Sequence, residues 1–270
     1  MLAYFRRPGR ALSALCVVAF AAPVCAQSTA TPPKPQVEAP AAPVEAALPS
    51  AQMILDRHVE AIGGRKALAG RTSVRTVGSV TIPANGMSGT IEVFAARPNK
   101  VLAKTTIAGI GDMSEGFDGT RAWSMSPMTG PMLATGEELA QKAFDADFDS
   151  SLNVASRYES MKTLEKTTFD GRPCYKVSLI RKDAGEDIEF YDVATGLKAG
   201  SIVSRKSPMG TITATSVMTD YKKFGDILQP TMLKQSMTGV EIVTTFSTIE
   251  YDKVDPATFE LPAPIKALIK

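Results

Sequence analysis

The chain has 270 residues, of which 21% are charged, with 30 lysine and arginine residues against 28 aspartate and glutamate residues. A net charge of only +2 gives no electrostatic reason to expect binding to nucleic acid or to an anionic membrane surface. Because His58 is the only histidine, a histidine-based metal centre is excluded, and we expect neither a metal nor another cofactor.

Residues 1–26 have the composition of an export signal. Three arginines in the first ten residues precede a short apolar stretch, which ends in small residues at Val24-Cys25-Ala26. The stretch is shorter than the ~20 residues that a membrane-spanning helix needs. We therefore expect cleavage after Ala26 and a periplasmic location, with an uncleaved anchor and a lipoprotein signal as alternatives. After cleavage Cys174 is the only cysteine left, which excludes a disulfide within the mature chain.

Residues 27–49 are rich in proline and alanine and contain no aromatic residue. Such a segment cannot bury enough apolar area to offset the conformational entropy lost on folding. We expect it to be a disordered tether. Residues 50–270 are then expected to form a single domain, since their number suffices for one large core.

The domain is predicted to begin with a helix over residues 50–62, capped by Ser50 and ended by Gly63-Gly64. One face of this helix is apolar at helical spacing and carries Ile54, Leu55, His58, Val59 and Ile62. A short turn of helix over residues 65–70 follows. The sequence then becomes rich in Val, Ile and Thr, which predicts strands over residues 72–82, 87–98, 99–109 and 113–119.

The next segment changes character after Asp118-Gly119, a signal for a two-residue hairpin turn. The returning strand carries Trp123, the only tryptophan. Residues 127–133 contain two prolines and a glycine, so we expect a mobile loop that stays out of the sheet. A capping box from Thr135 to Glu138 predicts a helix after this loop, and a second short helix is expected near residues 152–158.

Strands are expected to resume near residue 161 and to continue to the end of the domain. Asp170-Gly171, residues 194–196 and Gly225-Asp226 are turn signals between consecutive strands. Consecutive hairpins produce an antiparallel meander. We predict a mainly β fold with a helical lid (α+β), namely a curled antiparallel sheet or incomplete β-barrel of roughly 10–11 strands, with short helices covering the concave face.

A loosely filled concave face would leave an apolar cavity. The chain has twelve methionines, Met218 among them, and unbranched, polarisable methionine suits a cavity whose contents vary. We expect Trp123 and Met125 to face this cavity from one strand, and the lid helix to close it. The candidate ligand-binding residues are Trp123, Met125, Met128, Met132, Leu139, Phe144, Met53 and Val59. The alternative is that these side chains are ordinary core.

Several stretches in this layout are similar to one known family. They are the helix ending in Gly-Gly, "KALAGRTSVRTVGSV", "FDGTRAW" at the fifth strand, and the closing "YKKFGDILQPTML" and "DPATFELP". Together they resemble the periplasmic lipoprotein-carrier superfamily, often labelled outer-membrane lipoprotein-sorting proteins, over residues 50–262. The resemblance implies an incomplete antiparallel barrel, a helical lid and a cavity that shields acyl chains. It therefore implies an exported carrier or chaperone for an apolar ligand, such as a lipid or an acylated lipoprotein.

Two other functions remain open at this stage. The same fold suits a non-enzymatic accessory or scaffold domain that binds a protein partner in the cell envelope. A hydrolase is disfavoured, because His58 lies on an apolar helix face and no glycine-rich phosphate loop follows a strand. The acidic run from Glu186 to Glu189, interrupted by Ile188, is typical of the solvent face of a strand. We expect no catalytic residue and no enzymatic activity.

Overall fold

The computed structural model describes residues 47–183, 185–207 and 210–269. The expected export signal and nearly all of the expected tether lie outside the described residues. The described chain falls within one compact unit, Ala46–Lys270. No helix in the described ranges is long and apolar enough to cross a membrane.

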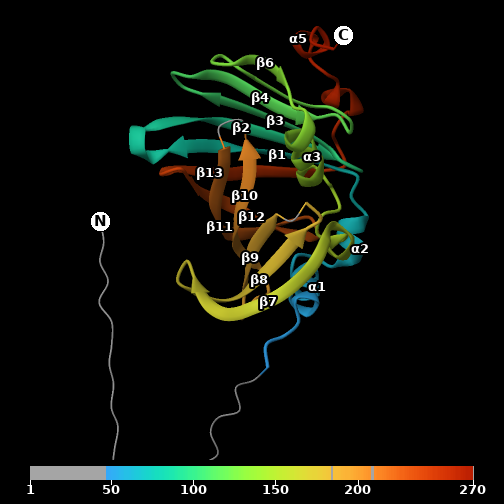
Figure 1. Ribbon diagram of the computed structural model, residues 1–270, viewed down its shortest axis with the longest axis vertical. Helices are drawn as coiled ribbons and strands as arrows, with labels where there is room; N and C mark the ends of the chain where they lie inside the picture. The colour runs from blue at the N-terminus through green and yellow to red at the C-terminus, as the bar shows by residue number, and fades with distance from the viewer. Residues whose placement is uncertain (1–46, 184, 208–209, 270) are drawn as a thin grey trace, which may run out of the picture. The chain divides into compact units, whose positions relative to one another are not determined.

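A single antiparallel sheet dominates this unit (Figure 1). Its order is β6-β5-β4-β3-β2-β1-β13-β12-β11-β10-β9-β8-β7, which makes 13 strands over the described residues. The first meander comprises β1 (Ser73–Ile82), β2 (Met87–Ala96), β3 (Lys100–Ile107), β4 (Gly111–Phe117), β5 (Ala122–Ser126) and β6 (Gly130–Leu133). The second comprises β7 (Tyr158–Phe169), β8 (Arg172–Arg181), β9 (Glu186–Asp192), β10 (Lys198–Ser207), β11 (Gly210–Phe224), β12 (Ile227–Met237) and β13 (Val240–Tyr251). The pairing of β1 with β13 joins the two meanders.

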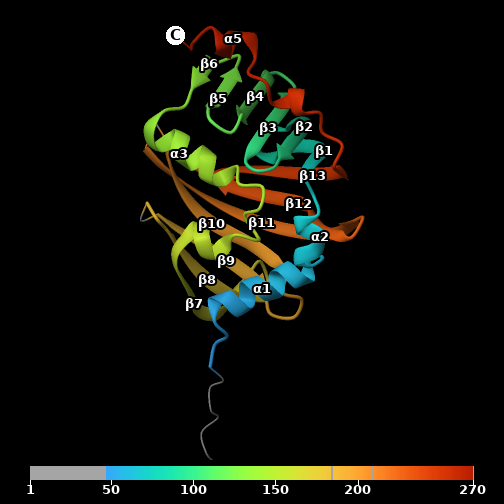
Figure 2. The ribbon, with the colours of Figure 1, turned by 90° about the vertical axis from the view of Figure 1, so that its right-hand side faces the viewer.

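Short helices cover one face of the sheet. They are α1 (Ala51–Ala61), α2 (Arg65–Ala69), α3 (Gly136–Asp145) and α4 (Val154–Arg157), whereas the 3-10 turn η2 (Pro256–Phe259) and helix α5 (Ala263–Lys266) follow the last strand. Helix α3 contacts β5 and β10, two strands far apart in the sheet order, so the face beneath it is concave. Figure 2 shows α1 on the same side. A curled, open sheet with a helical lid is therefore confirmed, with more strands than expected.

Local signals explain most of these elements. The Ser50 hydroxyl accepts a hydrogen bond from the backbone N–H of Met53 at 3.2 Å and caps α1, as predicted. Asp170 and Gly171 have φ values of 48° and 74°, which is the pattern that a two-residue turn between β7 and β8 requires. The other end of α1 is closed by Gly63 and Gly64, both with positive φ.

The segment after β5 differs from the expected loop. Residues 127–129 form a tight turn, and Gly130–Leu133 joins the sheet as β6, with Pro131 opposite Met125. A proline is tolerated here because β6 is an edge strand, where a missing N–H breaks no ladder on the outer side. The prediction that this segment stays out of the sheet is wrong.

Two predicted turn details also need correction. Phe117 pairs with Ala122, so the turn after β4 has four residues rather than two, held by N–H bonds from Thr120 and Arg121 to the Asp118 carboxylate. Thr135 is the residue that precedes α3, but its side chain makes no capping hydrogen bond. The expected capping box therefore predicted the start of the helix but not its bonding.

Successive residues of β5 pack on opposite faces of the sheet, as alternation requires. Ala122 lies with Phe117 on the concave face, in contact with the region of α3. Trp123 lies on the convex face, where the C-terminal segment covers it through Phe259 and Ile265. The only tryptophan therefore does not lie on the concave face beneath the lid.

Candidate functional site: two adjoining cavities

The larger cavity of the concave face, here called the central cavity, has a volume of about 370 Å³. That volume lies within the range of about 300–1,000 Å³ common for small-molecule sites. Strands of both meanders, α2, the end of α1 and the segment after α3 enclose it. Its apolar lining includes Ile62, Val74, Ala95, Val101, Met218 and Ile227. An apolar molecule could therefore be shielded from water inside the curled sheet.

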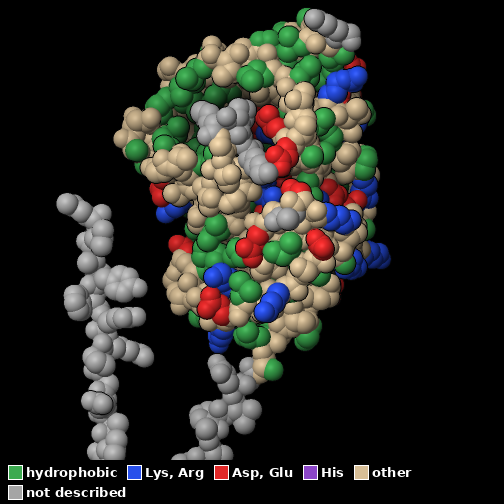
Figure 3. All heavy atoms as spheres, in the orientation of Figure 1, with side chains coloured by type: hydrophobic (Ala, Val, Ile, Leu, Met, Phe, Trp, Pro, Cys, Tyr) green, Lys and Arg blue, Asp and Glu red, His purple; other side chains and the backbone are tan. Residues whose placement is uncertain are grey.

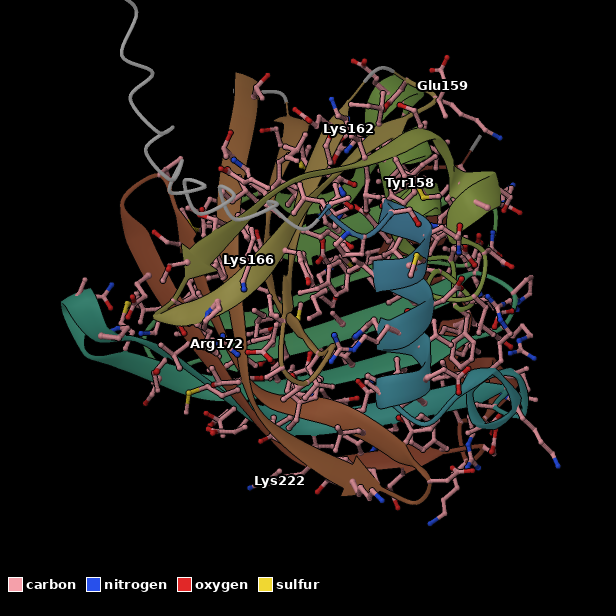
Figure 4. The ribbon with its side chains drawn as sticks, turned by 90° about the horizontal axis from the view of Figure 1, so that it is seen from below. Tyr158, Glu159, Lys162, Lys166, Arg172 and Lys222 are labelled. Carbon is pink, nitrogen blue, oxygen red and sulfur yellow. The ribbon has the colours of Figure 1, made fainter. Side chains whose placement is uncertain are left out.

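A second cavity, here called the polar cavity, has a volume of about 240 Å³ and lies between α1, the α3–α4 region and strands β8–β10. It shares His58, Asp145, Ser150, Ser151 and Lys198 with the central cavity, so the two spaces adjoin. Figure 4 shows Tyr158, another lining residue of the polar cavity, beside α1 at the start of β7. The concave face thus has one compartment lined by apolar side chains together with charged ones such as Arg71 and Asp149, next to a second compartment in which polar side chains predominate.

Asp187 is the most buried charge of the polar cavity. Its carboxylate accepts hydrogen bonds from Arg181 Nη1 and Arg205 Nη1, each at 2.7 Å, and from the Tyr158 hydroxyl at 3.3 Å. The side chains of Asp187 and Arg181 are only 4% and 8% exposed. Charges buried this deeply are tolerated only when partners and hydrogen bonds compensate for lost hydration.

Glu189 lies on the same face of β9, two residues from Asp187. It accepts hydrogen bonds from Lys198 Nζ and from the Tyr191 hydroxyl. Burial alone would raise the pKa of Glu189, but the charge of Lys198 and these hydrogen bonds hold it below its ordinary value. Glu189 is therefore a carboxylate at neutral pH.

The positions of these two acids differ from the expectation that the acidic run from Glu186 to Glu189 lies on the solvent face of a strand. Asp187 and Glu189 face the concave side, not solvent, while Ile188 and Phe190 pack on the convex side. There the Phe190 ring stacks on Phe169 with the ring centres 4.0 Å apart. Both faces of β9 are covered, so the alternation marks two buried environments of different polarity.

His58 lies where the two cavities meet. Its Nδ1 is 3.2 Å from the Gly196 carbonyl oxygen, and its ring packs edge-on against Tyr191. Burial, followed by the charge of Lys198, lowers the pKa of His58 to about 4, so the imidazole is neutral at physiological pH. When Nδ1–H donates to Gly196, Nε2 is left as an acceptor. Within the described ranges, Nε2 has no hydrogen-bond partner in the protein.

Residues 145–153, here called the strap, connect α3 to α4 and line both cavities. Three aspartates at alternate positions of the strap each bind an arginine from a different part of the fold. The pairs are Asp145 with Arg205 (3.0 Å), Asp147 with Arg157 (2.7 Å) and Asp149 with Arg97 (2.6 Å). Because Arg97 follows β2 and Arg205 belongs to β10, the strap is fastened to both meanders.

Comparison with solved structures shows that other proteins have a similar architecture. A DUF1329 family protein from Desulfovibrio piger aligns with a TM-score of 0.52 and 13% identity, over 78% of this chain and 97% of that one. A LolA superfamily protein from Nitrosomonas europaea aligns with a TM-score of 0.52 and 14% identity, over 79% of this chain and 99% of that one. The chain shares its fold with these two proteins. No protein-family model and no curated protein matches the sequence.

At this level of identity, the LolA-superfamily likeness shows the fold alone. It confirms the resemblance stated from the sequence as far as architecture is concerned. The contacts of this chain's own residues must therefore carry any statement about a ligand. Figure 3 shows positive and negative side chains interspersed on the visible face rather than gathered by sign, which agrees with the nearly balanced charge.

The structure does not bring the eight candidate ligand-binding residues together. Trp123 and Met125 line a separate groove on the convex face, of about 530 Å³, here called the convex groove. This groove is larger than the central cavity and, like it, has charged lining residues, such as Lys104, Asp112 and Glu260. It is lined by β3–β5 and the C-terminal segment, whereas strands of both meanders line the central cavity. The expectation that Trp123 faces the concave cavity differs from the structure, because its neighbour Ala122 has that position instead.

The other candidates divide between the lid and the surface. Val59 and Phe144 line the polar cavity, where the Phe144 ring lies 3.9 Å from the Arg157 guanidinium carbon. Leu139 packs α3 onto the concave face, as expected. Exposed methionines make up the rest: Met53 (64% exposed), Met128 (85%) and Met132 (46%). A ligand contact for any of the eight stays a prediction.

Sequence reasoning missed most of the cavity lining. Met218 was among the methionines noted along the strands and lines the central cavity. Ala95, Val101 and Ile227 carried no distinguishing signal, because small and branched apolar residues are common on every buried strand face. Asp187 and Glu189 gave a signal, an acidic run inside a β-rich segment, but its face was assigned wrongly.

Proposed function

We propose that the protein is an exported, non-enzymatic carrier or chaperone that shields an apolar ligand, such as an acyl chain of a lipid or lipoprotein, in the central cavity. The central cavity carries the proposal, since apolar side chains from both meanders line a space beneath the strap. Burial of an alkyl chain there would gain about 0.8 kcal/mol per methylene group removed from water. The export-signal composition of residues 1–26 supports a location in the cell envelope.

The ligand contacts follow from this position. We keep Val59 and Phe144 from the sequence-based candidates, since both line the polar cavity next to the central one. We add Val101, Met218 and Ile227, which line the central cavity itself. Met218 is the flexible member of this set and can adapt to chains of different shape.

Occupancy can be tested directly on the native protein. Mass spectrometry of an organic extract of the purified protein should detect a molecule with a long apolar chain. A fluorescent long-chain acyl probe should bind saturably. Because Trp123 lies on the convex face, its emission should stay constant when the probe enters the central cavity, whereas occupation of the convex groove would shift it.

A pair of neighbouring residues gives a matched test of position. Ala95 lines the central cavity, while Ala96, next to it on β2, packs against the convex cluster of Trp123. Ala95→Phe should fill the cavity and weaken probe binding by about tenfold or more, because the ring takes the space of the chain. Ala96→Phe, with the same added volume on the other face, should leave binding unchanged. Equal binding by both folded variants would contradict the proposal, as would an empty cavity in a protein that co-purifies with a protein partner.

A further inference from the structure

The polar cavity indicates which class of apolar ligand fits, an inference that rests on the proposed function. We propose that the ligand is an amphiphile with an uncharged, hydroxyl-bearing headgroup. Its alkyl chain lies in the central cavity and its headgroup lies in the polar cavity. The two cavities share five lining residues, so one molecule can extend from one into the other.

The charges around both cavities are already neutralised. Every Lys, Arg, Asp and Glu that lines either cavity, among the described residues, belongs to an ion pair within the protein. In the polar cavity these pairs are Arg205 with Asp145 and Asp187, Lys198 with Glu189, and Arg157 with Asp147. A charged headgroup would lose its hydration without meeting an unpaired opposite charge, which is costly.

Three uncharged polar groups at the junction of the cavities, by contrast, have no hydrogen-bond partner among the described residues. His58 is neutral, and its Nε2 is a free acceptor when Nδ1–H donates to Gly196. Among the described residues, the side-chain hydroxyls of Ser150 and Ser151 make no hydrogen bond within the protein, and Ser150 bonds only through its backbone N–H, to the Asp147 carbonyl oxygen. All three residues line both cavities. A ligand hydroxyl can donate to Nε2 and exchange hydrogen bonds with the serines, which satisfies groups that otherwise need water.

The neighbourhood of His58 strengthens this selection. A cationic imidazole would attract an anionic headgroup, but burial and Lys198 keep the ring neutral above a pKa of about 4. Lys198 itself is held by Glu189, which also accepts from Tyr191. The charged side chains nearest to the junction are therefore paired with one another, and a headgroup at the junction would be recognised through hydrogen bonds.

Competition against the fluorescent acyl probe tests the class of headgroup in the unmodified protein. The competitors are single-chain amphiphiles of equal chain length, below their micelle concentrations: a monoacylglycerol, an alkyl glucoside, a fatty acid and an alkyltrimethylammonium. The two uncharged competitors should displace the probe at concentrations at least about tenfold lower than the charged ones. Equal or tighter binding of either charged competitor would overturn the inference and leave the carrier function intact. Failure of the probe and of all four competitors to bind would overturn both.

Two variants of one ion pair sharpen the test. Glu189→Gln leaves Lys198 unpaired and should shift selectivity toward the fatty acid, whereas Lys198→Gln leaves Glu189 unpaired and should shift it toward the ammonium amphiphile. The matched controls are Glu165→Gln and Lys176→Gln, which break a 3.2 Å pair at the surface and line neither cavity. Unchanged selectivity in both folded cavity variants would count against the inference. If neither variant folds, the panel on the unmodified protein decides alone.

Discussion

The two meanders hold helix α3 in different ways. Against the first meander, Leu139 and Ala143 pack on Phe117 and Ala122 through apolar contacts. Against the second, the end of α3 is held by Asp145, which pairs with Arg205 beside the buried Asp187. Apolar packing is non-directional, whereas a charge-assisted hydrogen bond has a preferred geometry, and Arg205 is itself oriented by the buried carboxylate of Asp187. The charged contact therefore sets the position of the strap, and the apolar contact mainly adds area.

The largest effect should follow from removing the buried carboxylate of Asp187, which orients Arg205 for its contact with Asp145. Asp187→Ala leaves Arg181 and Arg205 without their shared carboxylate, and removing one partner of a buried pair costs about 3–5 kcal/mol. Urea unfolding measures the loss. Lys142→Gln is the control, since its pair with Glu115 is exposed and contributes at most about 1 kcal/mol. Equal small losses in both variants would show that burial does not distinguish the two contacts.

A smaller effect should come from pH at the cavity junction. The pKa of His58 is lowered in the folded state to about 4, by burial and then by Lys198, with Glu189 opposing. As the pH is lowered, His58 of the unfolded chain takes up a proton near the ordinary pKa of histidine, whereas His58 of the folded chain stays neutral until about pH 4. The free energy of unfolding therefore decreases as the pH is lowered between these two values. The loss from about pH 7 to about pH 5 should be about 2 kcal/mol.

His58→Gln isolates this contribution, because His58 is the only histidine and carboxyl groups titrate mainly below this window. The free energy of unfolding of the variant should stay nearly constant between the same two pH values. A pH dependence equal to that of the unmodified protein would assign the effect to other groups.

The smallest effect should come from the apolar side of α3. Leu139 is only partly buried, so Leu139→Ala should cost about 1–2 kcal/mol, below the range for a fully buried leucine. The same urea experiment measures it. Because the charged contact is intact, the variant should keep its selectivity among amphiphiles. A loss as large as that of Asp187→Ala would mean that apolar packing, not charge, positions the strap.

The comparison also explains what the sequence could reveal. Turn chemistry is local, so Asp170-Gly171 and Ser50 predicted a hairpin and a helix start correctly. The open, curled sheet followed from the succession of such hairpins. Strand β6 was missed because Pro131 argues against a central strand, and its edge position is a property of the assembled sheet.

The candidate site was harder to predict for a related reason. Alternation separates the two faces of a strand but does not say which face is inside, and a shift of one residue exchanges them. Trp123 and Asp187 were both assigned to the wrong face in this way. The concave side is the one that the strap covers, and the strap is held there by ion pairs with Arg97 and Arg205. These two arginines lie more than a hundred residues apart in the chain, so local sequence patterns do not reveal which side is covered.

The seam between β1 and β13 has a consequence for the kinetics of folding. Within each meander, consecutive strands pair, so their contacts form between residues close in the chain. The seam instead pairs residues such as Val74 and Tyr251, which lie near opposite ends of the domain. Closing so long a loop is entropically costly, and long-range contacts slow folding. We therefore expect the two meanders to assemble first and the seam to close late, with the first and last strands meeting in the rate-limiting step.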